Sequence, residues 1–278
     1  IPTMLISKFA KKKVSVVLTG DGADEIFGGY NRYVWIDRLS KISNINKKFL
    51  IILLNIIEKM SILGKDKYDT KLKIHKLISI LSSSDVQQMY NLSIFYDYEK
   101  NLLKNDDLSQ TNFFDFSNLN ISNLNNIEKM MLTDTKYYLS DDILCKVDRA
   151  SMNYSLESRA PYLSQELFDF ANSMPSGLKI NKKKNKYLLR KVLEKYLPKK
   201  LILNQKRGFS IPLGYWMKNK MKKWCYNSIF ENNSFSKKNF NIKVLSKIWE
   251  DHQNGKIDRS KILWNIVILN NWIKEWEI

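Results

Sequence analysis

The sequence contains one convincing β-strand in a chain that otherwise has helical patterning. Residues 15–18 (SVVL) form a short apolar, β-branched run that ends at the glycine-rich turn Thr19-Gly20-Asp21-Gly22. Helical patterning flanks this run at residues 3–12 and 23–33. A lone strand has two unpaired edges and needs neighbours, so the chain does not make a self-contained sheet. We therefore expect a fragment, truncated at its N-terminus, whose other strands lie in polypeptide before residue 1.

The rest of the chain is predicted to be helical with short breaks. Apolar residues recur at helical spacing over residues 38–103, with Gly64 as a breaker, and again over 127–156, whereas residues 104–126 are polar and turn-rich. Prolines and glycines after residue 160 divide that region into shorter helices. The last helix, 261–276, carries an apolar stripe that we assign to the core: Leu263, Trp264, Val267, Ile268 and Trp272.

Composition excludes several classes of protein. With 278 residues and 44% hydrophobic content the chain is globular, not disordered. Cys145 and Cys225 are far apart and form no CxxC pair, which argues against a zinc or disulfide framework and favours a reducing, cytoplasmic setting. His75 and His252 are isolated, which disfavours histidine-based metal or triad chemistry. We see no membrane span and no secretory leader.

The net charge of +18 leaves two interpretations open. A polyanionic partner such as nucleic acid would explain it, and residues 179–207 contain twelve lysines and arginines against one acid, Glu194. Solvated, lysine-rich faces explain it equally well, and no zinc finger or basic zipper supports the first interpretation. We favour the solvated faces and predict neither a nucleic-acid nor a membrane partner.

The turn after the strand is the first candidate site. A strand, a glycine-rich turn and a helix mark the place where α/β sheets bind nucleotides, but neither the dinucleotide fingerprint nor a P-loop is present. The turn instead presents three carboxylates, Asp21, Asp24 and Glu25. Carboxylates suit a phosphate site when Mg²⁺ bridges them to the phosphate. The alternative is a helix start at which acids interact with the positive end of the helix dipole.

A second candidate is the basic region 186–209. Lys186 begins a helix, and Lys206 and Arg207 precede Gly208 in a turn with an apolar continuation. A fixed cation there would stabilise the negative charge that develops in phosphoryl or adenylyl transfer. An ordinary solvated turn remains the alternative.

Four blocks together resemble the synthetase domain of glutamine-hydrolysing asparagine synthetases. They are VVLTGDGADEIFGGYNRY, YYLSDDILCKVDRASMNYSLESRAPYL, KYLLRKVLEKYLP and NQKRGFSIPLGYW, in the order of that family. The resemblance implies an α/β nucleotide-binding fold, PP-loop ATP pyrophosphatase-like and Rossmann-type. Because of the truncation, the part present is mostly α-helical. It implies that residues 1–278 are the C-terminal part of the synthetase domain.

The resemblance also implies a reaction and its residues. ATP and Mg²⁺ would activate aspartate as β-aspartyl-AMP, and ammonia from a glutaminase domain would displace AMP to give asparagine. Thr19 and Gly20 match the backbone positions that contact ATP, Asp21 the acidic position that serves the acyl-adenylate, and Asp24 the magnesium–pyrophosphate ligand. Lys206 matches the lysine of the adenylylation transition state, and two further cleft positions are matched by Asp142 and Lys186.

The chain departs from the family at three points. The SGGxDS loop that grips pyrophosphate and the glutaminase domain are absent, so we expect residues 1–278 alone to be inactive. Ser164 stands where the family usually has Asp, and Glu157 and Arg159 fit either a cleft or a structural ion pair. A related amidotransferase acting on another carboxylate, as in surface-polysaccharide or secondary-metabolite synthesis, shares these motifs. The family is often dimeric, so a homodimer is compatible with the resemblance.

Overall fold

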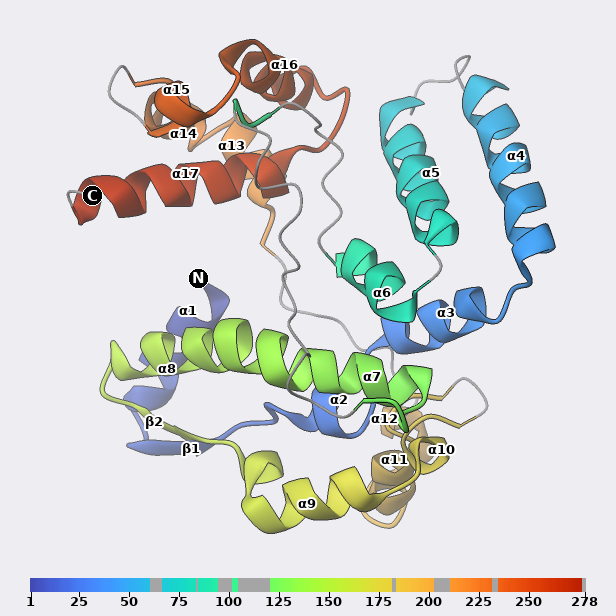
Figure 1. Cartoon of the computed structure of the whole chain (residues 1–278). Helices are drawn as coiled ribbons and strands as arrows, with labels where there is room; N and C mark the ends of the chain where they lie inside the picture. The colour runs from blue at the N-terminus through green and yellow to red at the C-terminus, as the bar shows by residue number, and fades with distance from the viewer. Residues whose placement is uncertain are drawn as a thin grey trace. The chain divides into compact units, whose positions relative to one another are not determined.

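The computed structural model divides into two compact units, each of which is mainly helical (Figure 1). The first is built from the described residues within 1–43, 83–93 and 113–210, and the second from those within 44–82, 94–112 and 211–278. The structure describes the following residues: 1–60, 67–83, 85–94, 102–104, 121–181, 184–202, 211–231 and 235–276.

A two-stranded parallel sheet lies in the first unit. The predicted strand is confirmed as β1 (Val16–Leu18), and it pairs with β2 (Glu157–Arg159) in the register Val16 to Glu157 and Leu18 to Arg159. Each strand follows a helix, and the two helices, α1 (Pro2–Lys11) and α8 (Cys145–Met152), pack together (Figure 1). The expectation of a single strand was therefore wrong, because β2 is a Glu-Ser-Arg segment without an apolar run.

The single helix expected over residues 23–33 is also wrong. The chain forms α2 (Ala23–Ile26), turns at residues 27–30, and begins again as α3 (Asn31–Ser40). Gly28 has φ +67°, a left-handed conformation that a helix interior does not accommodate. Ile26 and Phe27 pack with Ala171 and Met174 in the core of this unit.

The predicted helix over 127–156 is confirmed over most of its length. It begins as α7 (Asn126–Thr133), where Asn125 and Glu128 form a capping box, and continues through the π-type segment η3 (Asp134–Leu144) into α8. The remaining elements of this unit are α6 (Val86–Ile94), η4 (Pro161–Leu163), α9 (Gln165–Ser173), α10 (Ser176–Lys179), α11 (Tyr187–Leu193) and α12 (Lys199–Ile202).

The second unit contains a helix pair and a group of five further helices. In the pair, α4 (Asn44–Met60) packs on α5 (Lys67–Ser82). Gly64 and most of the loop predicted at residues 104–126 lie outside the described residues. The five further helices are α13 (Leu213–Lys218), α14 (Lys222–Phe230), α15 (Phe235–Asn239), α16 (Ile242–Gln253) and α17 (Ser260–Glu275).

The amphipathic C-terminal helix is confirmed as α17, but its stripe is only partly core. Leu263 and Val267 are fully buried with Ile229 and Leu245 of the neighbouring helices. Ile268 and Trp272 are about half exposed, so their assignment to the core was wrong. Among the helices that the structure describes, none is both long and apolar enough to cross a bilayer.

Candidate active site

The candidate site begins where the parallel strands end. The backbone N–H of Thr19 donates to the carbonyl of Arg159 at 2.7 Å and so extends the ladder by one residue. The Thr19 hydroxyl oxygen is shielded from solvent and has no hydrogen-bond partner among the described residues. A buried polar atom without a partner is costly and marks a place where a ligand or water would supply one.

Gly22 allows the turn to lead directly into α2. It occupies the N-cap of that helix with φ +85°, and a Cβ atom there would lie 2.3 Å from Cδ2 of Leu163. Both the backbone conformation and the close approach require glycine. The turn therefore places Asp24 and Glu25 in the first turn of α2.

Asp24 forms an ion pair with a residue more than 150 positions away in the sequence. Lys186 Nζ lies 3.0 Å from Asp24 Oδ1, and both side chains are about four-fifths buried. Gly29 lies against this pair, because a Cβ atom at Gly29 would be 1.7 Å from Asp24 Oδ1 and 2.5 Å from Cε of Lys186. The pair thus rests directly on a bare stretch of backbone.

Asn185 holds Lys186 in place. Its amide nitrogen donates to the carbonyl of Gly29 at 3.1 Å and to Oδ1 of Asn31 at 2.7 Å, and the Lys186 N–H donates to the Gly28 carbonyl at 3.3 Å. The side-chain oxygen of Asn185 is buried without a partner among the described residues, as is the Thr19 hydroxyl. No sequence pattern indicated these contacts of Asn185, since an asparagine before a helix is an ordinary turn residue.

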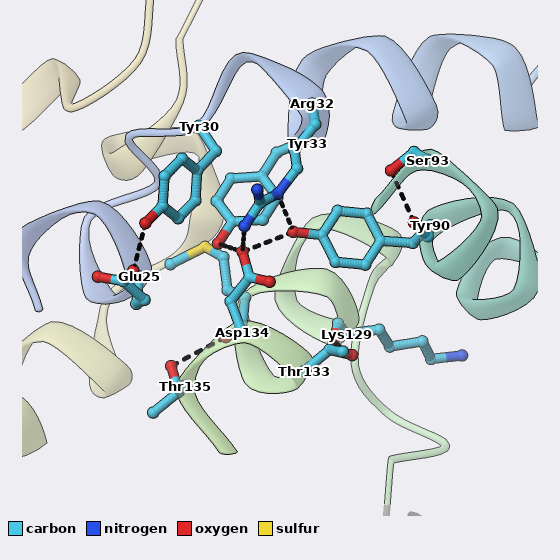
Figure 2. Close-up of polar contacts among 11 residues, drawn as sticks. Glu25, Tyr30, Arg32, Tyr33, Tyr90, Ser93, Lys129, Thr133, Asp134 and Thr135 are labelled. Carbon is cyan, nitrogen blue, oxygen red and sulfur yellow. Dashed lines mark hydrogen bonds and ion pairs between the residues drawn. The ribbon is translucent and has the colours of Figure 1, made fainter. Parts of the chain in front are cut away.

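A buried acid lies beside Asp24 on α2. The Tyr30 hydroxyl donates to Glu25 Oε1 at 2.5 Å, and Glu25 is almost wholly inaccessible to solvent (Figure 2). Burial raises the pKa of the Glu25 carboxyl, although the hydrogen bond from Tyr30 acts in the opposite direction. Of the three carboxylates in the turn, Glu25 is therefore committed to internal contacts.

Three comparisons with known proteins bear on this arrangement. The family model described as asparagine synthase matches residues 1–274. The chain belongs to the asparagine synthase family. It is 33% identical to asparagine synthetase [glutamine-hydrolyzing] 1 of Bacillus subtilis and 28% identical to a putative asparagine synthetase [glutamine-hydrolyzing] of Mycobacterium tuberculosis, over 98% of this chain in both cases. No solved structure matches it.

The chain spans only 42% of the length of the Bacillus subtilis relative and 41% of the Mycobacterium tuberculosis relative. A further Bacillus subtilis relative, asparagine synthetase [glutamine-hydrolyzing] 3, is 25% identical over 72% of this chain and 27% of its own length. The resemblance to the asparagine synthetase family is confirmed, and with it a predominantly helical chain of that family. The α/β nucleotide-binding assignment remains a prediction.

The structure brings some of the predicted family residues together. Asp24 and Lys186 are in contact, and Thr19 and Gly20 lie in the same turn. Asp142 is exposed on η3 beside Tyr138, whose pKa is raised by burial and then by the charge of Asp142. The ring of Tyr138 in turn packs edge to face on Tyr30 at a centroid distance of 5.9 Å. Asp142 is therefore linked to the acidic turn through two tyrosines.

The remaining residues predicted from the sequence make no contact with the Asp24–Lys186 pair that the structure describes. Asp21 lies half-exposed in the turn. Lys206 lies outside the described residues, so its expected place opposite the turn stays a prediction. Glu157 and Arg159 pair with each other at 2.7 Å on β2, which is the structural ion pair that we considered. Ser164 is the N-cap of α9 and makes no side-chain capping bond.

The donor set at the turn fits a single protein ligand for Mg²⁺. No group of three or more acidic, histidine or cysteine side chains suited to a metal occurs in the described parts of the chain. Mg²⁺ commonly takes one or two protein carboxylates and completes its shell with phosphate oxygens and water. Asp24 beside the Lys186 ammonium satisfies that requirement, because the amine would contact phosphate oxygens while the carboxylate contacts the ion.

Several cations of the basic region, residues 179–207, are buried or form contacts within the chain. Lys179 is buried, Lys186 pairs with Asp24, and Lys191 pairs with Glu194 at 2.9 Å. Arg190 donates to the backbone carbonyls of Asn185 and Ile202. Lys186 and Arg190 thus join segments of the first unit, whereas Lys184, Lys195 and Lys200 are exposed to solvent.

Proposed function

We propose that this chain provides part of the active site of an ATP-dependent ligase that converts aspartate to asparagine. The aspartate side-chain carboxylate attacks the α-phosphorus of ATP, pyrophosphate leaves, and ammonia released from glutamine then attacks the acyl carbon of β-aspartyl-AMP and expels AMP. The observation that carries the proposal is the Asp24–Lys186 pair, which lies on bare glycine backbone beside the carboxyl end of β1. Family membership supports it.

Each residue of the turn has a part in this proposal. The Thr19 and Gly20 backbone, with the unpartnered Thr19 hydroxyl, would contact ATP. Asp24 would hold Mg²⁺ and Lys186 the pyrophosphate; a bound Mg²⁺ would neutralise charge on the phosphate oxygens. Asp21 would take a proton from the attacking nitrogen.

Two residues act from outside this turn. Lys206 would stabilise charge on the α-phosphate during adenylylation. Asp142 would line the cleft beside Tyr138.

The first prediction concerns the Asp24–Lys186 pair. In the complete gene product that contains residues 1–278, Asp24→Asn and Lys186→Gln should each lower aspartate-dependent pyrophosphate release by roughly 100-fold or more, the usual cost of removing one electrostatic contact to a transition state. The matched control is Asp37→Asn, which breaks a pair with Lys41 at 2.6 Å on α3 and should leave the rate unchanged. Pyrophosphate release and asparagine formation are measured together.

The same assay separates the alternatives. An amidotransferase for another carboxylate would release pyrophosphate with a different acid in place of aspartate. Residues 1–278 assayed alone should release none, because the SGGxDS loop and the glutaminase domain are absent from them. Unchanged activity in both Asp24→Asn and Lys186→Gln would contradict the proposed site.

A further inference from the structure

An arginine that no motif singled out is the centre of a buried network next to the acidic turn. Arg32 Nη2 lies 2.7 Å from Oδ2 of Asp134, and the hydroxyls of Tyr33 and Tyr90 each donate to the same oxygen at 2.5 Å (Figure 2). Arg32 Nε also donates to the Tyr90 hydroxyl at 2.5 Å. Asp134 and both tyrosines are fully buried.

The network joins three segments that are distant in sequence. Arg32 and Tyr33 belong to α3, Tyr90 to α6 and Asp134 to the start of η3, and Figure 2 shows them converging on one carboxylate oxygen. The second oxygen of Asp134 is buried without a hydrogen-bond partner among the described residues. Every polar contact that the structure gives this carboxylate side chain therefore passes through Arg32 or a tyrosine beside it.

Stability alone does not account for such a cluster. Burying an ion pair costs desolvation that its attraction barely repays, and apolar replacements of similar volume are often as stable. What a fully formed polar network adds is a fixed geometry. The contacts of Arg32 show which part of the molecule the network holds in place.

Arg32 reaches both ends of the candidate site through aromatic rings. Its guanidinium carbon lies 4.0 Å from the ring centroid of Tyr30 and 4.9 Å from that of Tyr138. Tyr30 donates to Glu25, the neighbour of Asp24, and Tyr138 lies beside Asp142. A guanidinium plane suits such stacking, whereas an ammonium lacks the planar fork.

We propose that Arg32, anchored by Asp134, is a positioning residue for the acidic turn. By fixing Tyr30 and hence Glu25, it sets the orientation of α2 and of Asp24 toward Lys186. It touches neither substrate nor reacting atoms. The inference rests on the proposed function, because the turn has to be held in one geometry only if it binds a ligand.

The test compares two arginines of the same helix in the complete gene product. Arg32→Lys keeps the charge but loses the paired donors to Asp134 and Tyr90 and the stacking on the tyrosine rings. The control is Arg38→Lys, whose guanidinium carbon lies 6.0 Å from the ring centroid of Trp35 and takes no part in the network. We expect Arg32→Lys to speed hydrogen exchange at the backbone amides of residues 22–30 by about tenfold while amides of α9 stay protected. We also expect a 10- to 100-fold loss of kcat/KM for ATP, as misplacement near a reacting centre produces.

The outcomes separate the positioning role from the activity. Unchanged exchange at residues 22–30 in Arg32→Lys overturns the inference, whatever the activity. Faster exchange spread evenly over the first unit also overturns it, since that is what a purely structural residue would give. Faster exchange confined to the turn supports the inference, and if activity is then unaffected the proposed function fails instead. Arg32→Gln serves as a second variant if Arg32→Lys fails to fold.

Discussion

Lys186 combines a strained backbone with a side chain that we place in the proposed site. Its φ of +52° and ψ of +40° place a non-glycine residue in the left-handed region at the N-cap of α11. Such conformations cost an L-residue roughly 1–2 kcal/mol and persist where surrounding contacts fix them. Here the backbone carbonyls of Gly28 and Gly29 and the side chain of Asn31 accept hydrogen bonds from residues 185–186, and the Lys186 ammonium contacts Asp24.

Two substitutions separate the strain from the charge. Lys186→Gly and Lys186→Ala both remove the ion pair, but only glycine adopts the left-handed conformation without cost. The glycine variant should therefore be more stable than the alanine variant by about 1 kcal/mol in urea unfolding. Binding of Mg–ATP, measured by calorimetry, should be weakened in both. Equal stability of the two variants would show that the backbone is unstrained.

At this scale the sequence identifies residues better than it identifies their partners. The carboxylates of the turn and the lysine at a helix start have local signatures, namely a strand, a glycine turn and a helix boundary. The Asp24–Lys186 contact and the Arg32–Asp134 network join segments far apart in the chain, and a charged residue carries no mark of burial in the sequence. Those contacts required the fold.

Among the helices and strands, those with local sequence signals could be predicted, whereas those that depend on distant contacts could not. The helices α1, α7, α8 and α17 have apolar periodicity or a capping box and were predicted near their observed positions. The strand β2 was missed because Glu157–Arg159 exists only through pairing with β1. The split between α2 and α3 lies at Gly28, whose φ of +67° ends the helix, and the Gly28-Gly29 pair is a local turn signal that the expected helix did not take into account.

A histidine near the end of α16 predicts how acid changes the stability of the protein. His252 is fully buried, its Nδ1 accepts the N–H of Arg259 at 3.3 Å, and Asp258 and Lys218 are the charged groups that act on it. Burial lowers the pKa of His252 below that of an exposed histidine. Protonation is therefore harder in the folded protein than in the unfolded chain.

The sign of the pH dependence follows from that shift. The unfolded chain binds a proton at His252 near pH 6.5 and the folded protein only at lower pH, so this residue reduces the free energy of unfolding as pH falls through and below 6.5. His252→Gln should flatten the dependence of urea unfolding on pH between about pH 7 and pH 5. A slope in His252→Gln equal to that of the parent protein would contradict the prediction.

At the scale of the whole molecule, the first unit leaves one side of its small sheet bare. Val16 and Leu18 point to the same face because alternate strand residues do, and Leu18 is 73% exposed. On α1, Leu5 and Phe9 are 62% and 71% exposed. Parallel sheets are normally covered on both faces, and a two-stranded one is too small to be stable alone. In the α/β nucleotide-binding fold expected from the sequence, further strands would pair with the edges of this sheet and helices would cover its apolar faces.

That expectation predicts opposite effects of one substitution in two contexts. In residues 1–278 alone, Leu18→Lys should change the free energy of unfolding by no more than about 0.5 kcal/mol, because the side chain is exposed, and should reduce binding of a hydrophobic dye and self-association. In the complete gene product the same lysine would be buried under the elements that cover this face and should cost about 2 kcal/mol or more. Leu18→Ile, which keeps the apolar surface, is the control in both contexts. A neutral Leu18→Lys in the complete gene product would mean that nothing covers this face of β1, and the nucleotide-binding sheet would then have to be abandoned while the Asp24–Lys186 contact remained.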